Sequence, residues 1–217
     1  QRDERLGWTG DAQVYVHTAT LNADVQAFFT KWLVDLADAQ RADGQFPQVA
    51  PLKVAGDDGG PAWADAGVIV PLEVYRAYGD KRLLERQYPS MKRFIYFCRN
   101  RGGTPDGLPP EKFHCFGDWL SINADTPKDV IYTAYYAQSV RLAGRAAEVL
   151  GRQEDAGGFD DLFTQIKQMS GPVFVHLRTV KGKGYDAAEE NARKWHAVTP
   201  PMFADVATGT ASGSKSS

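Results

Sequence analysis

The chain has 217 residues, of which 43% are hydrophobic and 24% are charged, a globular composition with enough length for one or two domains. Its formal net charge of -2 excludes a general electrostatic attraction to nucleic acid or to an anionic membrane. The two cysteines, Cys98 and Cys115, have no metal-ligand spacing, so we expect ordinary buried thiols, no disulfide framework and no metal site.

The sequence contains neither an apolar run long enough to span a bilayer nor a signal peptide. We therefore expect a cytoplasmic protein without a membrane partner. Because it starts at Gln1 rather than at a methionine, we also expect the chain to be cut from something longer. The small and polar residues 210–217 predict a disordered tail.

The first 80 residues have the pattern of three helices joined by loops rich in glycine and proline. An apolar stripe predicts a helix over 11–21, and Asp24 is a candidate cap for a second helix over 24–40. A third helix is predicted over 62–78, with Pro71 at a kink or in an early first turn and Gly79 at its end. The residues expected on the apolar face of the second helix are Phe28, Trp32, Leu33 and Leu36.

Two longer helical segments follow. One is predicted over 81–101, and Pro89 is expected to divide it. After a long loop over 102–125, Thr126 as a cap and Pro127 at the first helical position predict a helix that ends at Leu150. Helix pairs with their long loops on one side suggest a toroid of α-hairpins whose open mouth carries the active site. The apolar face of 81–101 is expected to contain Leu84, Tyr88, Met91, Ile95 and Cys98.

The pattern changes after the glycine-rich stretch 151–158. A short amphipathic helix is predicted over 159–169, where it would pack against the helix that ends at Leu150. The β-branched and aromatic run 173–180 then predicts a strand. A helix followed by a strand is half of an α/β unit, and such a unit after a helical chain indicates a junction. The predicted fold is therefore mainly α, a partial (α/α)6 toroid of helical hairpins followed by a short helix-strand α/β fragment.

The first eleven residues combine three acids, two arginines and a tryptophan around two glycines. A carboxylic acid can protonate a glycosidic oxygen, a carboxylate can bridge sugar hydroxyls, and an indole can cover the apolar face of a pyranose. Loops with acids and arginines are also common as surface ion pairs that contribute little. The composition alone leaves both interpretations open.

This segment resembles the catalytic signature of bacterial and fungal α-L-rhamnosidases, which are inverting glycoside hydrolases built on an (α/α)6 toroid. Further matching segments follow in the order expected for the family, so that the resemblance covers about residues 1–155. These segments are Phe29–Leu33, Ala50–Pro51, Ala62–Ala66, Phe116–Leu120 and Thr126–Pro127.

The resemblance implies that a rhamnose-containing glycoside is the partner and that Glu4 is the general acid that protonates the leaving oxygen. It also implies that Asp11 holds rhamnose hydroxyls. Ordinary core tryptophans and loop or cap aspartates are the alternative interpretation of the remaining candidates. The implied aromatic walls of the sugar pocket are Trp8, Trp63 and Trp119, and its further carboxylates are Asp65 and Asp118.

An inverting glycosidase also needs a second carboxyl group, about 6.5 to 9.5 Å from the acid, to activate water. In the family this base is a glutamate far downstream, near an Asn-His-Tyr motif that the sequence does not contain. Fewer than half of the toroid's helices are predicted here. We therefore expect these residues to be inactive alone and to self-associate through exposed helix faces.

Residues 171–176, 179–185 and 194–198 resemble the end of the thiamine domain of 1-deoxy-D-xylulose-5-phosphate synthase, a transketolase relative. This second resemblance spans about residues 158–209. A basic surface turn is the alternative interpretation of its Lys-Gly-Lys-Gly sequence. Because the Gly-Asp-Gly…Asn segment that would hold Mg²⁺ is missing, we expect no cofactor and no thiamine binding. The candidate phosphate or cofactor contacts are Lys181, Lys183 and His196.

Three parts are thus predicted: a six-hairpin domain fragment over 1–155, a thiamine-domain fragment over 156–209 and a tail over 210–217. Three functions stay open at this point. The chain is a glycoside hydrolase fragment of the α-L-rhamnosidase type, a thiamine-dependent transferase fragment, or a chimera with no function of its own.

Overall fold

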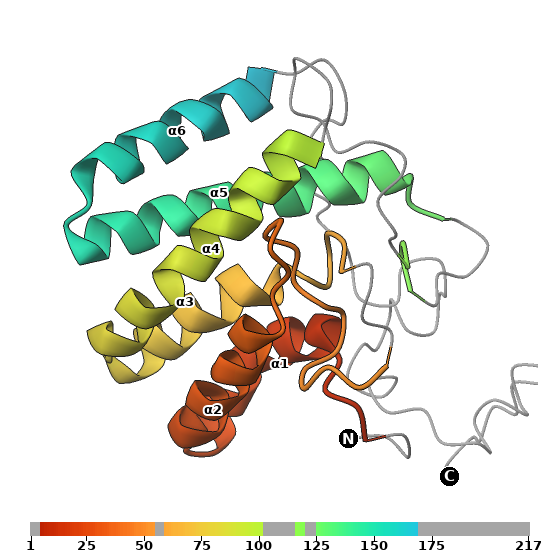
Figure 1. Ribbon diagram of the computed structural model, residues 1–217, viewed down its shortest axis with the longest axis vertical. Coiled ribbons are helices and arrows are strands. Elements are labelled where there is room, and N and C mark those ends of the chain that lie inside the picture. Colours follow the sequence, from red (N-terminus) through yellow and green to blue (C-terminus); the bar gives the residue numbers. More distant parts are fainter. Residues whose placement is uncertain (1–4, 55–58, 102–115, 120–124, 169–217) are drawn as a thin grey trace, which may run out of the picture. The chain divides into compact units, whose positions relative to one another are not determined.

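A computed structural model describes residues 5–54, 59–101, 116–119 and 125–168, all of which lie in one compact unit (Figure 1). In this part of the chain the backbone pairing outside the helices includes one isolated bridge, Trp8 to Val49, and no strand. The predicted mainly α fold is confirmed, whereas the predicted strand over 173–180 and the tail over 210–217 lie outside the described residues. The helices are α1 (Thr9–Asn22), α2 (Gln26–Asp38), α3 (Ala66–Tyr78), α4 (Lys81–Arg101), α5 (Lys128–Leu150) and α6 (Gln153–Gln168).

α3 is the helix around which the others pack. It contacts α1, α2, α4 and α5, while α6 packs along α5 (Figure 1). A helix that is apolar on nearly every side is stable only when it is buried. This packing against four helices offsets the backbone hydrogen bond that Pro71 cannot make inside the helix. The predicted end at Gly79 is confirmed, because Gly79 adopts the left-handed conformation with φ 70°.

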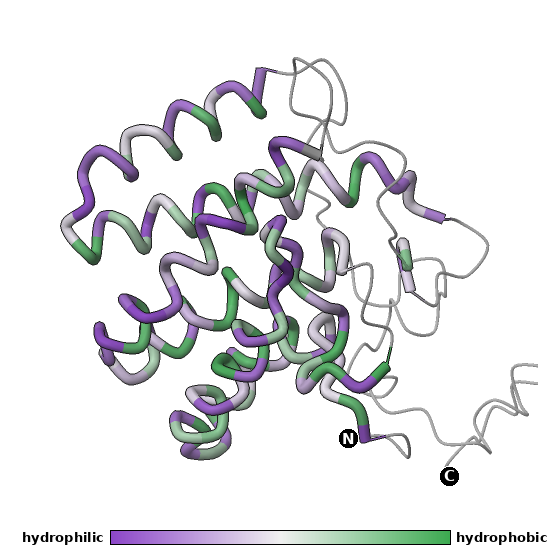
Figure 2. Tube along the Cα trace, viewed as in Figure 1, coloured by the Kyte–Doolittle hydropathy of each residue, from purple (hydrophilic) through white to green (hydrophobic). Residues whose placement is uncertain are grey.

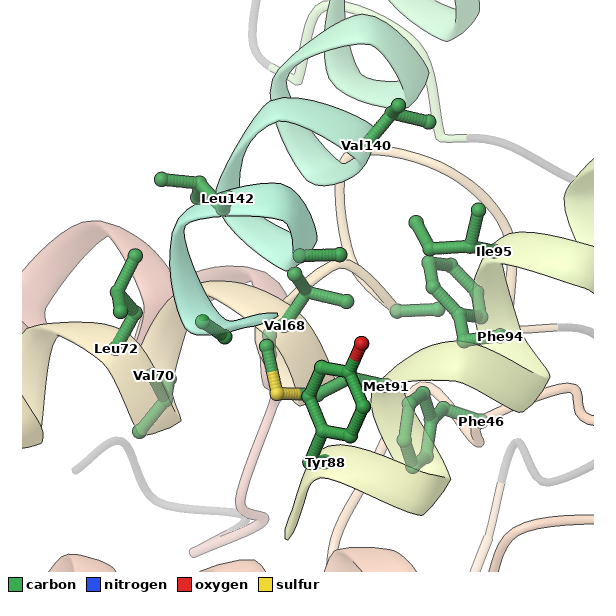
Figure 3. Packing of buried hydrophobic residues seen from close by; sticks show 14 of the residues in the cluster. Phe46, Val68, Val70, Leu72, Tyr88, Met91, Phe94, Ile95, Val140 and Leu142 are labelled. Carbon is green, nitrogen blue, oxygen red and sulfur yellow. The ribbon is translucent and has the colours of Figure 1, made fainter. Parts of the chain in front are cut away.

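The prediction that Pro89 divides the fourth helical segment is wrong, because α4 runs unbroken from Lys81 to Arg101. The predicted apolar face continues across the proline, and Figure 3 shows part of it beside Val68 of α3. Burial of such a side chain contributes about 1.5 to 3 kcal/mol, so several of them outweigh the roughly 3 kcal/mol cost of proline. The buried residues of this face are Leu84, Tyr88, Met91, Ile95 and Cys98.

α2 buries Phe29 in place of the predicted Phe28. Phe29 is 4% exposed and Phe28 is 60% exposed, whereas Trp32, Leu33 and Leu36 are buried as predicted. The four buried positions have the spacing i, i+3, i+4 and i+7 of one helix face. Phe28 precedes that face by one residue, about 100° around the helix axis, and therefore points away from the core.

Two residues predicted as N-caps make other hydrogen bonds. α2 begins at Gln26 after Val25, and the Asp24 carboxylate accepts the backbone N–H of Gln26 at 3.3 Å without capping the helix. α5 begins at Lys128, so Pro127 precedes the helix instead of opening it. The Thr126 hydroxyl donates to Asp118 at 2.8 Å, which ties the start of α5 to the segment 116–119.

α6 begins at Gln153, six residues before the predicted start, and includes Gly157 and Gly158 of the predicted junction, whereas Gly151 ends α5. It packs along α5, as predicted, and buries one face of an amphipathic pattern that is visible as alternating hydrophilic and hydrophobic segments (Figure 2). Its first turn is fixed to α4, because Asp155 accepts the Tyr88 hydroxyl at 2.8 Å and Lys92 Nζ at 2.6 Å. The hydrogen bond from Lys92 lowers the pKa of Asp155. The buried residues of α6 are Ala156, Phe159, Leu162 and Ile166.

Several large apolar side chains of α1 and α2 remain exposed: Val14, Tyr15, Leu21 and Phe28. Self-association through such faces stays a prediction. Among the helices of the described residues, none combines the length and the apolar character that crossing a membrane requires.

We expect Gly67→Ala to lower the free energy of unfolding by about 1 to 3 kcal/mol, the usual cost of overpacking a core. A Cβ at position 67 lies 2.1 Å from Cε2 of Phe46, so the ring has to move. Gly158→Ala makes the same change in α6, where the added Cβ meets nothing within 4 Å. This control should raise stability by up to about 1 kcal/mol. Urea denaturation of both variants checks the pair, and equal effects would contradict the close packing at Gly67.

Candidate functional site

An open cavity of about 1180 Å³ lies between α1, α2, the segment 116–119 and the start of α5. Five of the residues that the sequence predicted for a sugar pocket line this cavity, although they are spread over more than half of the chain. These five are Trp8, Asp11, Trp63, Asp118 and Trp119. Glu4 lies outside the described residues, as do Lys181, Lys183 and His196, and Asp65 is not among the residues that line the cavity.

The segment before α1 is held at the cavity by backbone pairing with residues 48–50. Ala50 N–H donates to Gly7 C=O and Thr9 N–H donates to Gln48 C=O, each at 2.9 Å. The indole N–H of Trp32, from α2, donates to Ala50 C=O at 2.9 Å. The N-terminal segment, the following loop and α2 are therefore fixed together, which places Trp8 in the cavity wall.

The indole of Trp63 lies against the first turn of α1. A Cβ added to Gly10 would be 2.7 to 2.8 Å from the indole atoms Nε1, Cδ1 and Cε2, so a side chain at this position would displace the ring. Glycine at position 10 therefore lets Trp63 lie close to the helix backbone.

Phe116 contacts three of the four tryptophans that line the cavity, Trp8, Trp63 and Trp119. Its ring centroid lies 4.9 Å from that of Trp63, 5.7 Å from that of Trp119 and 5.9 Å from that of Trp8. Tilted and edge-on aromatic pairs at such distances are favourable. Phe116 was not among the residues predicted for the site, although it stands two residues before Asp118, which was predicted.

The cavity carries both signs of charge. Asp11, Asp35 and Asp118 supply carboxylates, and Arg5 and Lys31 supply cations. Lys31 Nζ is 2.5 Å from the Asp35 carboxylate, an ion pair one turn apart on α2 that sequence reasoning did not place in the site. Among the described residues, no group of three or more His, Cys, Asp and Glu side chains is placed to hold a metal ion.

Asp65 lies behind the cavity and is 1% exposed. Its carboxylate accepts the backbone N–H of Ala62 at 2.7 Å and the hydroxyl of Ser139 at 2.5 Å. Burial raises the pKa of Asp65 to about 6, although both hydrogen bonds act in the opposite direction. The pKa of the buried Cys98 thiol is raised by burial and by the charge of Asp65.

Comparison with known proteins finds similarity to two families. The family profile described as the bacterial alpha-L-rhamnosidase 6 hairpin glycosidase domain matches residues 1–204. An α-L-rhamnosidase of Streptomyces avermitilis is 45% identical over 176 residues, which are 80% of this chain and 16% of that protein. A short C-terminal segment is similar to 1-deoxy-D-xylulose-5-phosphate synthase of Porphyromonas gingivalis, with 57% identity over 49 residues, 23% of this chain and 7% of that protein.

The helical part also matches a solved structure. The crystal structure of the S. avermitilis α-L-rhamnosidase complexed with L-rhamnose aligns with a TM-score of 0.69 over 77% of this chain and 16% of that chain. The predicted resemblance to both families is confirmed, and so is the helical fold of the six-hairpin type. This chain spans between 16% and 21% of the length of the three α-L-rhamnosidases it matches. The predicted boundary at 155/156 stays a prediction.

Proposed function

Because this chain belongs to the bacterial alpha-L-rhamnosidase 6 hairpin glycosidase family, we propose that its cavity binds the terminal α-L-rhamnosyl unit of a glycoside. The observation that carries the proposal is the convergence of Trp8, Asp11, Trp63, Asp118 and Trp119 on one cavity. These residues come from three separate segments of the chain. If they were only core tryptophans and surface ion pairs, they would not need to line the same cavity.

The chemistry of the lining suits a 6-deoxy sugar. Indole faces cover the apolar C–H surface of a pyranose, and the C6 methyl group of rhamnose favours an apolar wall. Asp11 and Asp118 can accept hydrogen bonds from sugar hydroxyls. The sugar is thus bound between aromatic walls and carboxylates.

Glu4 is the proposed general acid for inverting hydrolysis. It protonates the leaving glycosidic oxygen while a second carboxylate, about 6.5 to 9.5 Å away, activates water on the opposite face of the sugar. Its chain neighbour Arg5 lines the cavity, which supports this assignment. We place the second carboxylate outside these 217 residues, since the family's Asn-His-Tyr motif does not occur in them. The chain alone then binds rhamnose without hydrolysing the glycoside.

Hydrolysis of 4-nitrophenyl α-L-rhamnoside tests the assignment of roles. The purified chain, shown to be helical by circular dichroism, should release no 4-nitrophenol above the rate of the Glu4→Gln variant. Turnover by the wild-type chain that disappears in Glu4→Gln would support Glu4 as the acid but contradict the placement of the base outside the chain. Turnover that survives in Glu4→Gln would contradict the role of Glu4.

Gly10→Ala should weaken the binding of L-rhamnose by at least about tenfold, which corresponds to about 1.4 kcal/mol. The added methyl group meets the indole of Trp63 at 2.7 to 2.8 Å and displaces it from its place in the cavity wall. Gly157→Ala is the matched control, since the added Cβ meets nothing within 4 Å. Binding is measured by tryptophan fluorescence, and equal affinity of the two variants would contradict a role for Trp63 as a wall of the site.

The cytoplasmic location and the absence of a cofactor stay predictions. The short C-terminal similarity to 1-deoxy-D-xylulose-5-phosphate synthase does not by itself favour a thiamine-dependent activity, because the metal-binding segment is missing from the sequence.

A further inference from the structure

The turn before Trp63 has an unusual backbone conformation. Ala62 adopts φ 74°, in the left-handed region that L residues with a side chain rarely occupy. Such a conformation is strained and persists only where the surroundings determine it. Ala62 is buried at 8% exposure, so solvent does not hold this turn.

Two buried side chains hold Ala62 from opposite sides. Asp65 accepts the N–H of Ala62 at 2.7 Å, and Gln13 Nε2 donates to the C=O of Ala62 at 2.5 Å. Asp65 stands directly before α3 and Gln13 belongs to α1, so the turn is fixed to two helices. Both backbone groups of the residue that precedes Trp63 are therefore satisfied in the left-handed conformation.

We propose that Asp65 is a positioning residue for the sugar site: by holding the Ala62 turn together with Gln13, its buried carboxylate directs the indole of Trp63 into the cavity. This inference rests on the proposed function. Asp65 is 1% exposed and does not line the cavity, so it does not contact the sugar directly. It acts on the sugar site through Trp63 instead.

The two carboxylate oxygens of Asp65 accept different hydrogen bonds. The positioning of Trp63 can therefore be tested separately from a general contribution of Asp65 to stability. Oδ2 accepts the N–H of Ala62, whereas Oδ1 accepts the hydroxyl of Ser139 on α5. Only the bond to Ala62 leads to Trp63. Ser139→Ala therefore removes a buried hydrogen bond of the same carboxylate without releasing the turn. Asp65→Asn keeps an oxygen for the N–H of Ala62 and gains an amide N–H that can donate to Ser139.

L-Rhamnose binding is compared in the wild-type chain and in Asp65→Ala, Asp65→Asn and Ser139→Ala, each at a temperature where circular dichroism shows it folded. Asp65→Ala should weaken binding at least about tenfold, while Asp65→Asn and Ser139→Ala should stay within about threefold of wild type. If Asp65 contributed to stability alone, the loss of rhamnose affinity in each variant would parallel its loss of folding stability. If Asp65→Ala binds like wild type, or if Ser139→Ala loses as much as Asp65→Ala, the proposal is wrong.

A second readout separates this proposal from the proposed function. The indole N–H resonance of Trp63, assigned with Trp63→Phe, reports the placement of the ring without a ligand. It should shift or broaden in Asp65→Ala and remain in place in Ser139→Ala. If the wild-type chain fails to bind rhamnose while the resonance responds in this way, the proposed function fails and the positioning by Asp65 stands. An unmoved Trp63 resonance in Asp65→Ala overturns the positioning itself.

Discussion

Phe29→Ala should lower the free energy of unfolding by about 3 to 5 kcal/mol, the range found when a buried phenylalanine is truncated to alanine. The Phe29 ring is 4% exposed and packs edge-on against Trp32, with 6.3 Å between the ring centroids. Its loss removes apolar contacts in the core and leaves unfilled space beside α2. Because net stabilities are about 5 to 15 kcal/mol, this one substitution threatens the whole fold.

Phe28→Ala is the matched control, with the same atoms removed one residue earlier. The Phe28 ring is 60% exposed, so its truncation should cost less than about 1 kcal/mol. Denaturant unfolding, followed by circular dichroism, measures both variants. Costs of similar size, or a larger cost for Phe28→Ala, would contradict the orientation of α2.

Asp65 should make the chain less stable as the pH rises from 4 to 7, by about 2 to 3 kcal/mol from this residue alone. The folded pKa of about 6 lies above the ordinary value of 3.8, because burial disfavours the carboxylate. Between these two values the folded chain binds more protons than the unfolded chain. Its stability therefore falls as the pH rises through this window, and the loss is complete above the folded pKa.

The wild-type chain is compared with Asp65→Asn to isolate this contribution. Asp155 has a lowered pKa, so its contribution to stability is lost as the pH falls instead of as it rises. Because Asp155 is present in both proteins, its contribution cancels in the comparison. The titratable group on α4 that faces Asp65 is Cys98, whose raised pKa keeps it a neutral thiol in this range. The stability of Asp65→Asn relative to wild type should rise by about 2 to 3 kcal/mol from pH 4 to pH 7. A difference that stays constant over this range contradicts the burial of an ionisable group at position 65.

The periodicity of apolar residues predicted the helices well because it depends on burial, which the sequence encodes directly. It predicted the buried face of α4, and the glycine at position 79 predicted the end of α3. The proline-based prediction of a break at Pro89 failed, because local propensity is a weak force beside the packing of an entire buried face. The periodicity missed Phe29 because two adjacent phenylalanines differ by only one position in the helix register. Which of the two phenylalanines is buried depends on how α2 packs against its neighbouring helices.

The candidate site was predicted through motifs, and those motifs could identify residues but not their placement. Trp8 and Trp119 are far apart in sequence but line the same cavity. The loops that bring them there have conformations that the sequence pattern does not predict. Phe116, which connects the tryptophans, looks like any other aromatic residue in the sequence. Asp65 is an aspartate like other sugar-binding residues, but it does not line the cavity. Its buried position depends on the turn at Ala62 and on Ser139 of α5, which is far away in the sequence.

The central claim, that the cavity is a rhamnose site, is tested most directly by titrating the isotope-labelled chain with L-rhamnose and following the indole N–H resonances. We expect saturable shifts of the resonances of Trp8, Trp63 and Trp119, each assigned with a Trp→Phe variant, and no such shifts with D-glucose at the same concentrations. If the chain is folded and none of these three resonances responds to L-rhamnose, or if both sugars shift them equally, the cavity is not the site that we propose.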